Sequence, residues 1–233
     1  MEVPIIGSDS VKWVEVSVPS SSSSSSAAIA ASPPFPLAPP TEDYASSSGV
    51  KDSPTHLIWK IHKALPHALE LLELSANKEF PMMGLRINFP DALSPFAFVC
   101  QNQIDYSARH PCLLYALTVS GVAYLLKLRN ISTYASSSAF PSDELLEFNI
   151  HTYSNHGAIT TVAATAGCFA VGFNDGSVCC FQLGILDQSA PDFVHELRDD
   201  SGIGRLWGII SRILASDSIR LNIKRVACGA LNV

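Results

Sequence analysis

The sequence predicts an all-β fold, an incomplete β-propeller of about three to four blades. From residue 55 onward, short apolar runs alternate with Gly, Pro, Asn and Asp, which is typical of short strands joined by turns. Residues 159–183 contain three such runs in succession, as a propeller blade does. Because a four-stranded blade takes about 40 to 45 residues, residues 55–212 have room for three to four blades. A β-sandwich would show similar strands, so this pattern leaves that architecture open.

The N-terminal segment, residues 1–18, contains one short strand. Val14, Val16 and Val18 alternate along it and share one face with Lys12. A Ser/Pro-rich segment follows over residues 19–54, with a run of serines and a cluster of prolines. Such a composition cannot bury enough apolar surface to offset its ordering entropy, so we expect a disordered loop there.

The first part of the predicted propeller holds six strand candidates. They are residues 56–61, 68–74, 85–89, 96–101, 113–118 and 122–128. Pro66 separates the first two candidates, and Pro90 and Pro95 separate the next two. Ser120-Gly121 predicts a hairpin between the last two. The second candidate could equally form two turns of helix.

The clearest blade-like unit comprises residues 159–164, 168–173 and 177–183. Asn174-Asp175-Gly176 precedes the third strand. This sequence predicts a hairpin with a type I′ turn, whose central residues need positive φ. Three antiparallel strands within about 25 residues are typical of a propeller blade.

The charge of the chain restricts its partners. Charged residues make up only 15% of it, against about 25% in typical soluble domains. A chain with so little charge tends to cover part of its surface with another chain. The formal net charge is −6, and the Lys and Arg residues are scattered. We therefore expect no direct binding of nucleic acid, which needs a clustered basic face.

The six cysteines match no zinc or disulfide spacing, because none forms a C-x-x-C pair. We expect reduced thiols in the core, which fits the cytosol or nucleus. The N-terminus lacks the basic and apolar regions of a secretory signal. The longest apolar stretch, residues 113–128, is interrupted by Thr118, Ser120, Gly121 and Lys127. Two strands explain this stretch better than a transmembrane segment.

Several short patterns resemble elements of catalytic or ligand sites, but each is incomplete. Ser75 and Lys78 match the S-x-x-K of penicillin-binding enzymes, whose companion motifs are absent. No two of the seven histidines have the spacing of zinc ligands. Gly202 and Gly204 lack the third glycine of a dinucleotide-binding loop.

The acidic pairs and the tryptophans favour structural roles. Adjacent residues on a strand point to opposite faces, so Asp143-Glu144 and Asp199-Asp200 are expected in solvated turns. Trp13, Trp59 and Trp207 are expected to pack between blades. We predict no catalytic, cofactor-binding or metal-binding residues and a protein that is not an enzyme.

Several longer stretches resemble one known family. They are residues 67–75, 89–95, 121–130, 193–200 and 204–208. These stretches are similar to the N-terminal β-propeller of the 160-kilodalton nucleoporin family, most closely its plant members, over roughly residues 1–212. The family offers no catalytic residues to carry over.

The resemblance implies a structural subunit of the nuclear pore complex, in the Y-shaped scaffold complex of its outer ring. It implies contacts with other Y-complex nucleoporins and a location in the nucleus, at the nuclear envelope. It also implies a supporting role in nucleocytoplasmic transport, including mRNA export and protein import. In the family, the propeller continues into a long α-helical solenoid.

Residues 213–233 do not resemble the family's continuation. We therefore expect a divergent C-terminal tail and a chain that is truncated relative to the family. An open propeller exposes sheet edges and blade faces, so we expect the chain alone to be marginally stable or prone to aggregate. Two alternatives stay open: a propeller adaptor in another nuclear or cytosolic assembly, and a truncated product without independent function.

Overall fold

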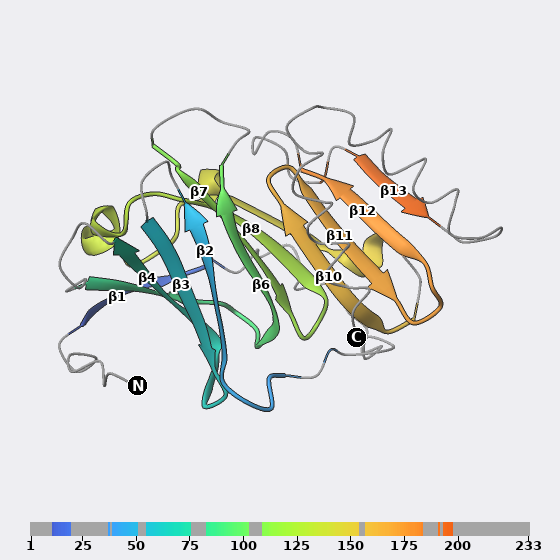
Figure 1. Cartoon of the computed structure of the whole chain (residues 1–233), viewed down its shortest axis with the longest axis horizontal. Helices are drawn as coiled ribbons and strands as arrows, with labels where there is room; N and C mark the ends of the chain where they lie inside the picture. Colours follow the sequence, from blue (N-terminus) through green and yellow to red (C-terminus); the bar gives the residue numbers. More distant parts are fainter. Residues whose placement is uncertain are drawn as a thin grey trace.

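The computed structural model describes residues 11–19, 37, 39–50, 55–75, 83–102, 109–153, 157–183, 191 and 193–197. These residues form three β-sheets, which lie side by side in chain order (Figure 1). The expectation of an all-β fold in the form of an incomplete propeller is confirmed, with one blade-like sheet of five strands and two of four.

The first sheet has the strand order β1-β5-β4-β3-β2. Its strands are β1 (Lys12–Ser17), β2 (Tyr44–Val50), β3 (Thr55–His62), β4 (Leu65–Ser75) and β5 (Met83–Asn88). Strands β2 to β5 pair antiparallel with their sequence neighbours. Strand β1 is different, because it pairs in parallel with β5. Residues from the N-terminal segment thus complete the outer edge of this sheet.

The second and third sheets are antiparallel, with the strand orders β6-β7-β8-β9 and β10-β11-β12-β13. The second contains β6 (Leu93–Gln101), β7 (Cys112–Thr118), β8 (Val122–Leu128) and β9 (Leu145–Asn149). The third contains β10 (Ile159–Thr165), β11 (Cys168–Phe173), β12 (Val178–Gln182) and β13 (Phe193–Leu197). Short 3₁₀ helices flank β9: η3 (Ile131–Ser136), η4 (Ser142–Glu144) and η5 (Ile150–Thr152).

The strands that begin the three antiparallel meanders approach one another, since β6 contacts both β2 and β10. This places β2, β6 and β10 on the inner side of the blades, while β5, β9 and β13 lie toward the periphery. Sheets that converge at their first strands and diverge at their last have the arrangement of propeller blades.

Two hydrophobic layers hold the sheets together, one on each side of the second sheet. Every residue of β7 is buried. Leu114 and Ala116 of this strand belong to the layer against the first sheet. Leu113, Tyr115 and Leu117 belong to the layer against the third sheet. A strand that is covered on both faces reads as a continuous apolar run, which explains the sequence of residues 112–117.

The expectation of a loop over residues 19–54 is wrong for residues 44–50, which form β2. Its sequence, YASSSGV, carries few of the large apolar residues that favour strands. The strand forms because all seven of its residues pair with β3 at the inner edge of the sheet. Most of the remaining Ser/Pro-rich segment lies outside the described residues.

The other strand predictions are confirmed, with changes at the ends. Residues 68–74 form a strand within β4, which settles the choice between strand and helix. The hairpin of β7 and β8 and the three strands β10, β11 and β12 are present as expected. Strands β9 and β13, the outer strands of their sheets, were not among the predicted strands.

The turn between β11 and β12 differs from the expected type I′ turn. The N–H of Phe173 donates to the Ser177 carbonyl at 3.0 Å, and the N–H of Gly176 donates to the Phe173 carbonyl at 3.1 Å. Gly176 has a φ of 84°. This is the pattern of a three-residue hairpin loop whose last residue is left-handed. Only Gly176 needs a glycine for its backbone conformation.

Candidate interaction surface

The described residues contain no assembled metal or membrane-spanning site. No group of three or more His, Cys, Asp or Glu side chains among them is placed to hold a metal ion. No helix in this part of the chain is long and apolar enough to cross a membrane. The cysteines at positions 100, 112, 168, 179 and 180 are free thiols. Of the S-x-x-K pattern, Ser75 ends β4 and Lys78 lies outside the described residues.

Trp59 packs between sheets as the sequence predicts, whereas Trp13 lies on the outward face of the first sheet. Trp59 is buried between the first and second sheets, and its indole N–H donates to the Ala97 carbonyl at 3.1 Å. Trp13 lies across Gly84, where a Cβ would meet the ring at 2.4 Å. The Arg86 guanidinium stands 5.4 Å from the centre of the Trp13 ring. Trp207, Asp199-Asp200, Gly202 and Gly204 lie outside the described residues.

Glu144 is not in a solvated turn, contrary to the expectation for the Asp143-Glu144 pair. Its side chain is only 2% exposed. Arg129 Nε donates to both carboxylate oxygens, at 2.7 and 2.9 Å, and His110 Nε2 lies 2.7 Å from Oε1. The hydrogen bonds to Glu144 raise the pKa of the Arg129 guanidinium. The carboxylate therefore joins three segments of the second sheet, which is a structural role.

One face of the first sheet packs on the second sheet, and its other face carries linked charges. Asp43 accepts from Lys60 at 3.0 Å, and its carboxylate lies 3.3 Å from His62 Nδ1. The backbone N–H of Lys63 also donates to Asp43 at 3.0 Å. These interactions, first the backbone hydrogen bond and then the Lys60 contact, lower the pKa of Asp43 from 3.8 to about 2.

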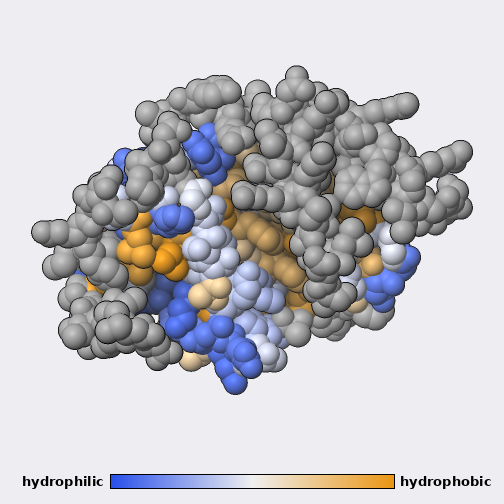
Figure 2. Space-filling view, in the orientation of Figure 1, coloured by the Kyte–Doolittle hydropathy of each residue, from blue (hydrophilic) through white to orange (hydrophobic). Residues whose placement is uncertain are grey.

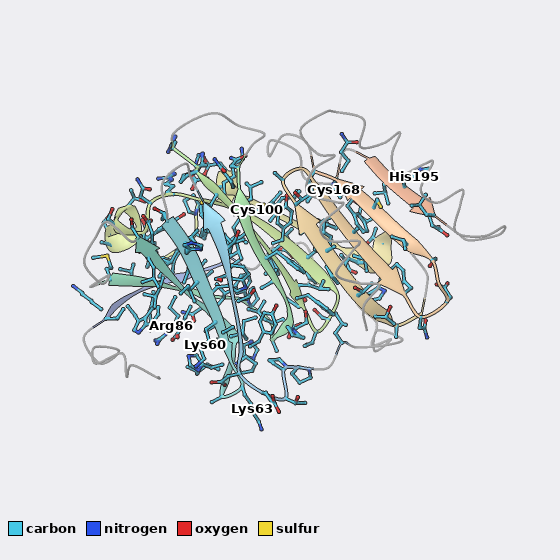
Figure 3. All side chains as sticks on the ribbon, viewed as in Figure 1. Lys60, Lys63, Arg86, Cys100, Cys168 and His195 are labelled. Carbon is cyan, nitrogen blue, oxygen red and sulfur yellow. The ribbon has the colours of Figure 1, made fainter. Side chains whose placement is uncertain are left out.

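The chain of charges continues to the outer edge of the same face. His62 Nε2 lies 2.8 Å from Glu70, and Arg86 donates to Glu70 from two nitrogens, at 2.8 and 3.1 Å. Arg86 also donates to Glu15 of β1 at 2.6 Å. Figure 3 labels Lys60 and Arg86 on this part of the molecule. The ladder crosses the sheet and neutralises most of its own charge.

An apolar patch adjoins the charged ladder on this face. Register places Ile58 of β3 opposite Leu72 of β4, and His56 opposite Leu74. Ile58, Leu72 and Leu74 are half-buried. Figure 2 shows hydrophobic side chains beside hydrophilic ones over the first sheet, at the left of the view. This face is therefore amphipathic.

The face of the third sheet that points away from the second has a different composition. Alternation and register place these residues on it: Thr161, Ala163, Thr165, Cys168, Ala170, Gly172, Val178, Cys180, Gln182, His195 and Leu197. The described part of this face has no Lys, Arg, Asp or Glu. Burial raises the pKa of Cys168 to about 11 and that of Cys180 to about 12, so both stay protonated thiols near neutral pH.

The two outward faces thus offer surfaces for protein contact. The first is amphipathic and internally paired. The described part of the third is uncharged, and its side chains are mostly small, which suits the close approach of another β-sheet. The sequence does not reveal these faces before the strand register is known, because a shift of one residue exchanges them.

Comparison with known proteins identifies the family of the chain. The family described as "Nucleoporin Nup120/160, beta-propeller domain" matches residues 55–227. The match continues past residue 212, into residues 213–227 of the segment that was predicted to be a divergent tail. The nuclear pore complex protein NUP160 of Arabidopsis thaliana is 45% identical over 217 residues. That similarity covers 91% of this chain but only 14% of the relative, so the chain spans a small part of its relative's length.

Among solved structures, human WBSCR16 superposes with a TM-score of 0.33 and 12% identity, over 66% of this chain and 40% of that chain. A TM-score this low carries no argument about fold or function. The match to the nucleoporin propeller covers most of the chain and agrees with the blade-like sheets. The chain belongs to the Nup120/160 nucleoporin family, and its sheets are part of that family's β-propeller domain.

Proposed function

We propose that this chain is a structural component of the nuclear pore complex, located at the nuclear envelope, and that it catalyses no reaction. The observation that carries this proposal is the 45% identity with a nuclear pore complex protein over 91% of the chain. The outward sheet faces support it, because they present areas for protein contact. The finer proposal is a place in the outer-ring scaffold, beside other Y-complex nucleoporins, in support of mRNA export and protein import.

A fluorescently tagged form of the full chain, expressed in plant cells, tests the location. A rim at the nuclear envelope is the expected result. Affinity capture of the same form tests the partners, and outer-ring nucleoporins should be enriched over an unrelated propeller that carries the same tag. A diffuse signal together with no enrichment would favour an adaptor in another assembly or a product without independent function.

A matched pair of variants distinguishes docking from misfolding. Ala170→Lys places a charge on the uncharged outward face of the third sheet, whereas Ser47→Lys places one on the outward face of the first sheet. If the third sheet docks in the pore scaffold, Ala170→Lys should weaken the rim and Ser47→Lys should not. Equal loss of the rim at equal protein levels would count against docking by the third sheet.

A further inference from the structure

The N-terminal strand β1 occupies a groove whose two walls come from different sheets. One wall is β5, to which β1 pairs in parallel from Lys12 opposite Met83 to Ser17 opposite Asn88. The other wall is residues 138–140, which follow η3 in the connection between β8 and β9 of the second sheet. The N–H of Ser17 donates to the Ser138 carbonyl at 3.0 Å, and the Ser17 carbonyl accepts from the N–H of Phe140 at 2.8 Å. At Ser17 the strand is therefore hydrogen-bonded on both of its edges.

The floor of the groove receives every second side chain of the strand. Val14, Val16 and Val18 are 8%, 0% and 5% exposed. They belong to the same hydrophobic layer as Tyr134 and Phe140 of the second sheet. β-Branched side chains suit these positions because they fit a pleated, buried surface. The floor thus selects an extended segment with three apolar residues at alternate positions.

The outward side chains of the strand, Trp13 and Glu15, contact Gly84 and Arg86 of β5. Gly84 leaves room for the Trp13 ring, since a Cβ there would lie 2.4 Å from one ring atom and 2.7 Å from another. Arg86 faces Glu15 and donates to it at 2.6 Å. Arg86 also contacts the Trp13 ring, at 5.4 Å from its centre. An aromatic residue and an acidic residue, two positions apart, therefore match the open side of the groove.

We propose that the groove between β5 and residues 138–140 is a binding site for an extended peptide segment, and that β1 is its occupant in this chain. The segment it accepts has an aromatic residue opposite Gly84, an acidic residue opposite Arg86 and apolar residues at the alternate positions. Addition of a strand to an exposed sheet edge is a general mode of peptide recognition, with backbone hydrogen bonds for affinity and side-chain pockets for specificity. The contacts of β1 with these walls are all non-covalent, so the strand can be separated from the groove by one cut in the chain.

A cut between β1 and β2 in the folded full chain tests this proposal. A protease site is inserted between residues 28 and 29, the purified protein is cleaved, and the pieces are separated by size exclusion. The N-terminal piece should remain bound. A fluorescent peptide of residues 10–20, added in excess, should then replace it, as measured by anisotropy.

Variant peptides test whether binding in the groove depends on the peptide sequence. Val16→Asp should weaken binding at least about tenfold, because it puts a charge into the apolar floor. Lys12→Ala is the matched control, since Lys12 is exposed, and it should bind like the native peptide. Gly84→Ala in the acceptor should weaken the native peptide more than the Trp13→Ala peptide, because the added methyl group meets the native ring at 2.4 Å, whereas its contact with Leu72 at 3.0 Å is the same for both peptides.

Three results would overturn the proposal. The cleaved N-terminal piece could leave while the remainder keeps its circular dichroism spectrum. The remainder could unfold or precipitate after the cut, which would make β1 inseparable from the fold. The Val16→Asp peptide could bind as well as the native peptide.

Discussion

At the residue scale, the carboxylate of Glu144 links the connections between the strands of the second sheet. It receives hydrogen bonds from Arg129 and lies within hydrogen-bond distance of His110, and these residues come from different connections of the sheet. A buried charge is tolerated only when it is paired and hydrogen-bonded. Removal of one partner therefore lowers the free energy of unfolding by more than the intact pair contributes to it.

Glu144→Gln should lower the free energy of unfolding by about 2 kcal/mol, because the charged hydrogen bonds from the partly exposed Arg129 to the buried carboxylate are weakened. The midpoint of urea unfolding measures this change. Asp143→Asn is the control, since Asp143 is the exposed neighbour and also loses one negative charge. Equal midpoints for the two variants would show that Glu144 contributes no more than a surface charge.

Asp43 should make stability depend on pH in the acid range. Its folded pKa is about 2, below its ordinary value of 3.8. A carboxyl group whose pKa is lowered by folding stabilises the fold above its unfolded pKa and loses that contribution as the pH falls through the folded pKa. The contribution should therefore fade between about pH 4 and pH 2.

The measurement compares urea midpoints at several pH values for the native chain and Asp43→Asn. The variant should be less stable than the native chain at pH 6, and the difference should shrink toward pH 2. Glu42→Gln, at the adjacent exposed position, controls for the loss of one negative charge. A difference that stays constant from pH 6 to pH 2 would contradict the ion-pair origin of the effect.

At the scale of elements, periodicity predicted the strands whose apolar residues face a core. The strands β3, β7, β8, β11 and β12 were all predicted from alternating or continuous apolar runs. The strand β2 was missed because Ser46, Ser47 and Ser48 carry no such signal; its pairing with β3 is what orders it. The parallel pairing of β1 with β5 was also not predictable, since it joins residues about 70 positions apart.

Candidate surfaces were harder to predict than strands. The sequence placed Glu144 in a solvated turn, whereas its side chain is only 2% exposed. No local sequence pattern predicts that Arg129 and His110 contact Glu144, because the three residues lie far apart in the sequence. The charged ladder on the first sheet has the same origin: register aligns Lys60, Glu70 and Arg86 across three strands.

The β11–β12 loop offers a test of backbone conformation alone. Gly176 has a φ of 84°, and a Cβ added there would meet no atom within 4 Å. Gly176→Ala should therefore cost about 1 kcal/mol from the left-handed conformation without any steric contribution. Thermal melting measures the change. Gly49→Ala is the control, because a Cβ at Gly49 meets only ordinary contacts, the nearest at 3.8 Å from His56. A loss at Gly49 as large as that at Gly176 would rule out φ as the cause.

At the scale of the whole molecule, the described part of the second sheet packs against another sheet on both faces, whereas the first and third sheets each do so on one face. The outward face of the first sheet can stay in water, because its charged groups are paired within the face. The described part of the outward face of the third sheet has mostly small side chains and no Lys, Arg, Asp or Glu. The two outward faces therefore differ, and we expect the third sheet to associate more readily with another protein surface.

This asymmetry predicts how the isolated chain should associate. We expect its weight-average mass in light scattering to rise with concentration, because apolar sheet surface is removed from water by contact between copies. Ala170→Lys should reduce the rise, since a desolvated ammonium opposes packing of that face. Ser47→Lys changes the net charge equally but lies on the first sheet, and it should leave the rise unchanged. A chain that stays monomeric and melts sharply and reversibly above about 50 °C, as ordinary mesophile domains do, would show that the third sheet needs no further cover.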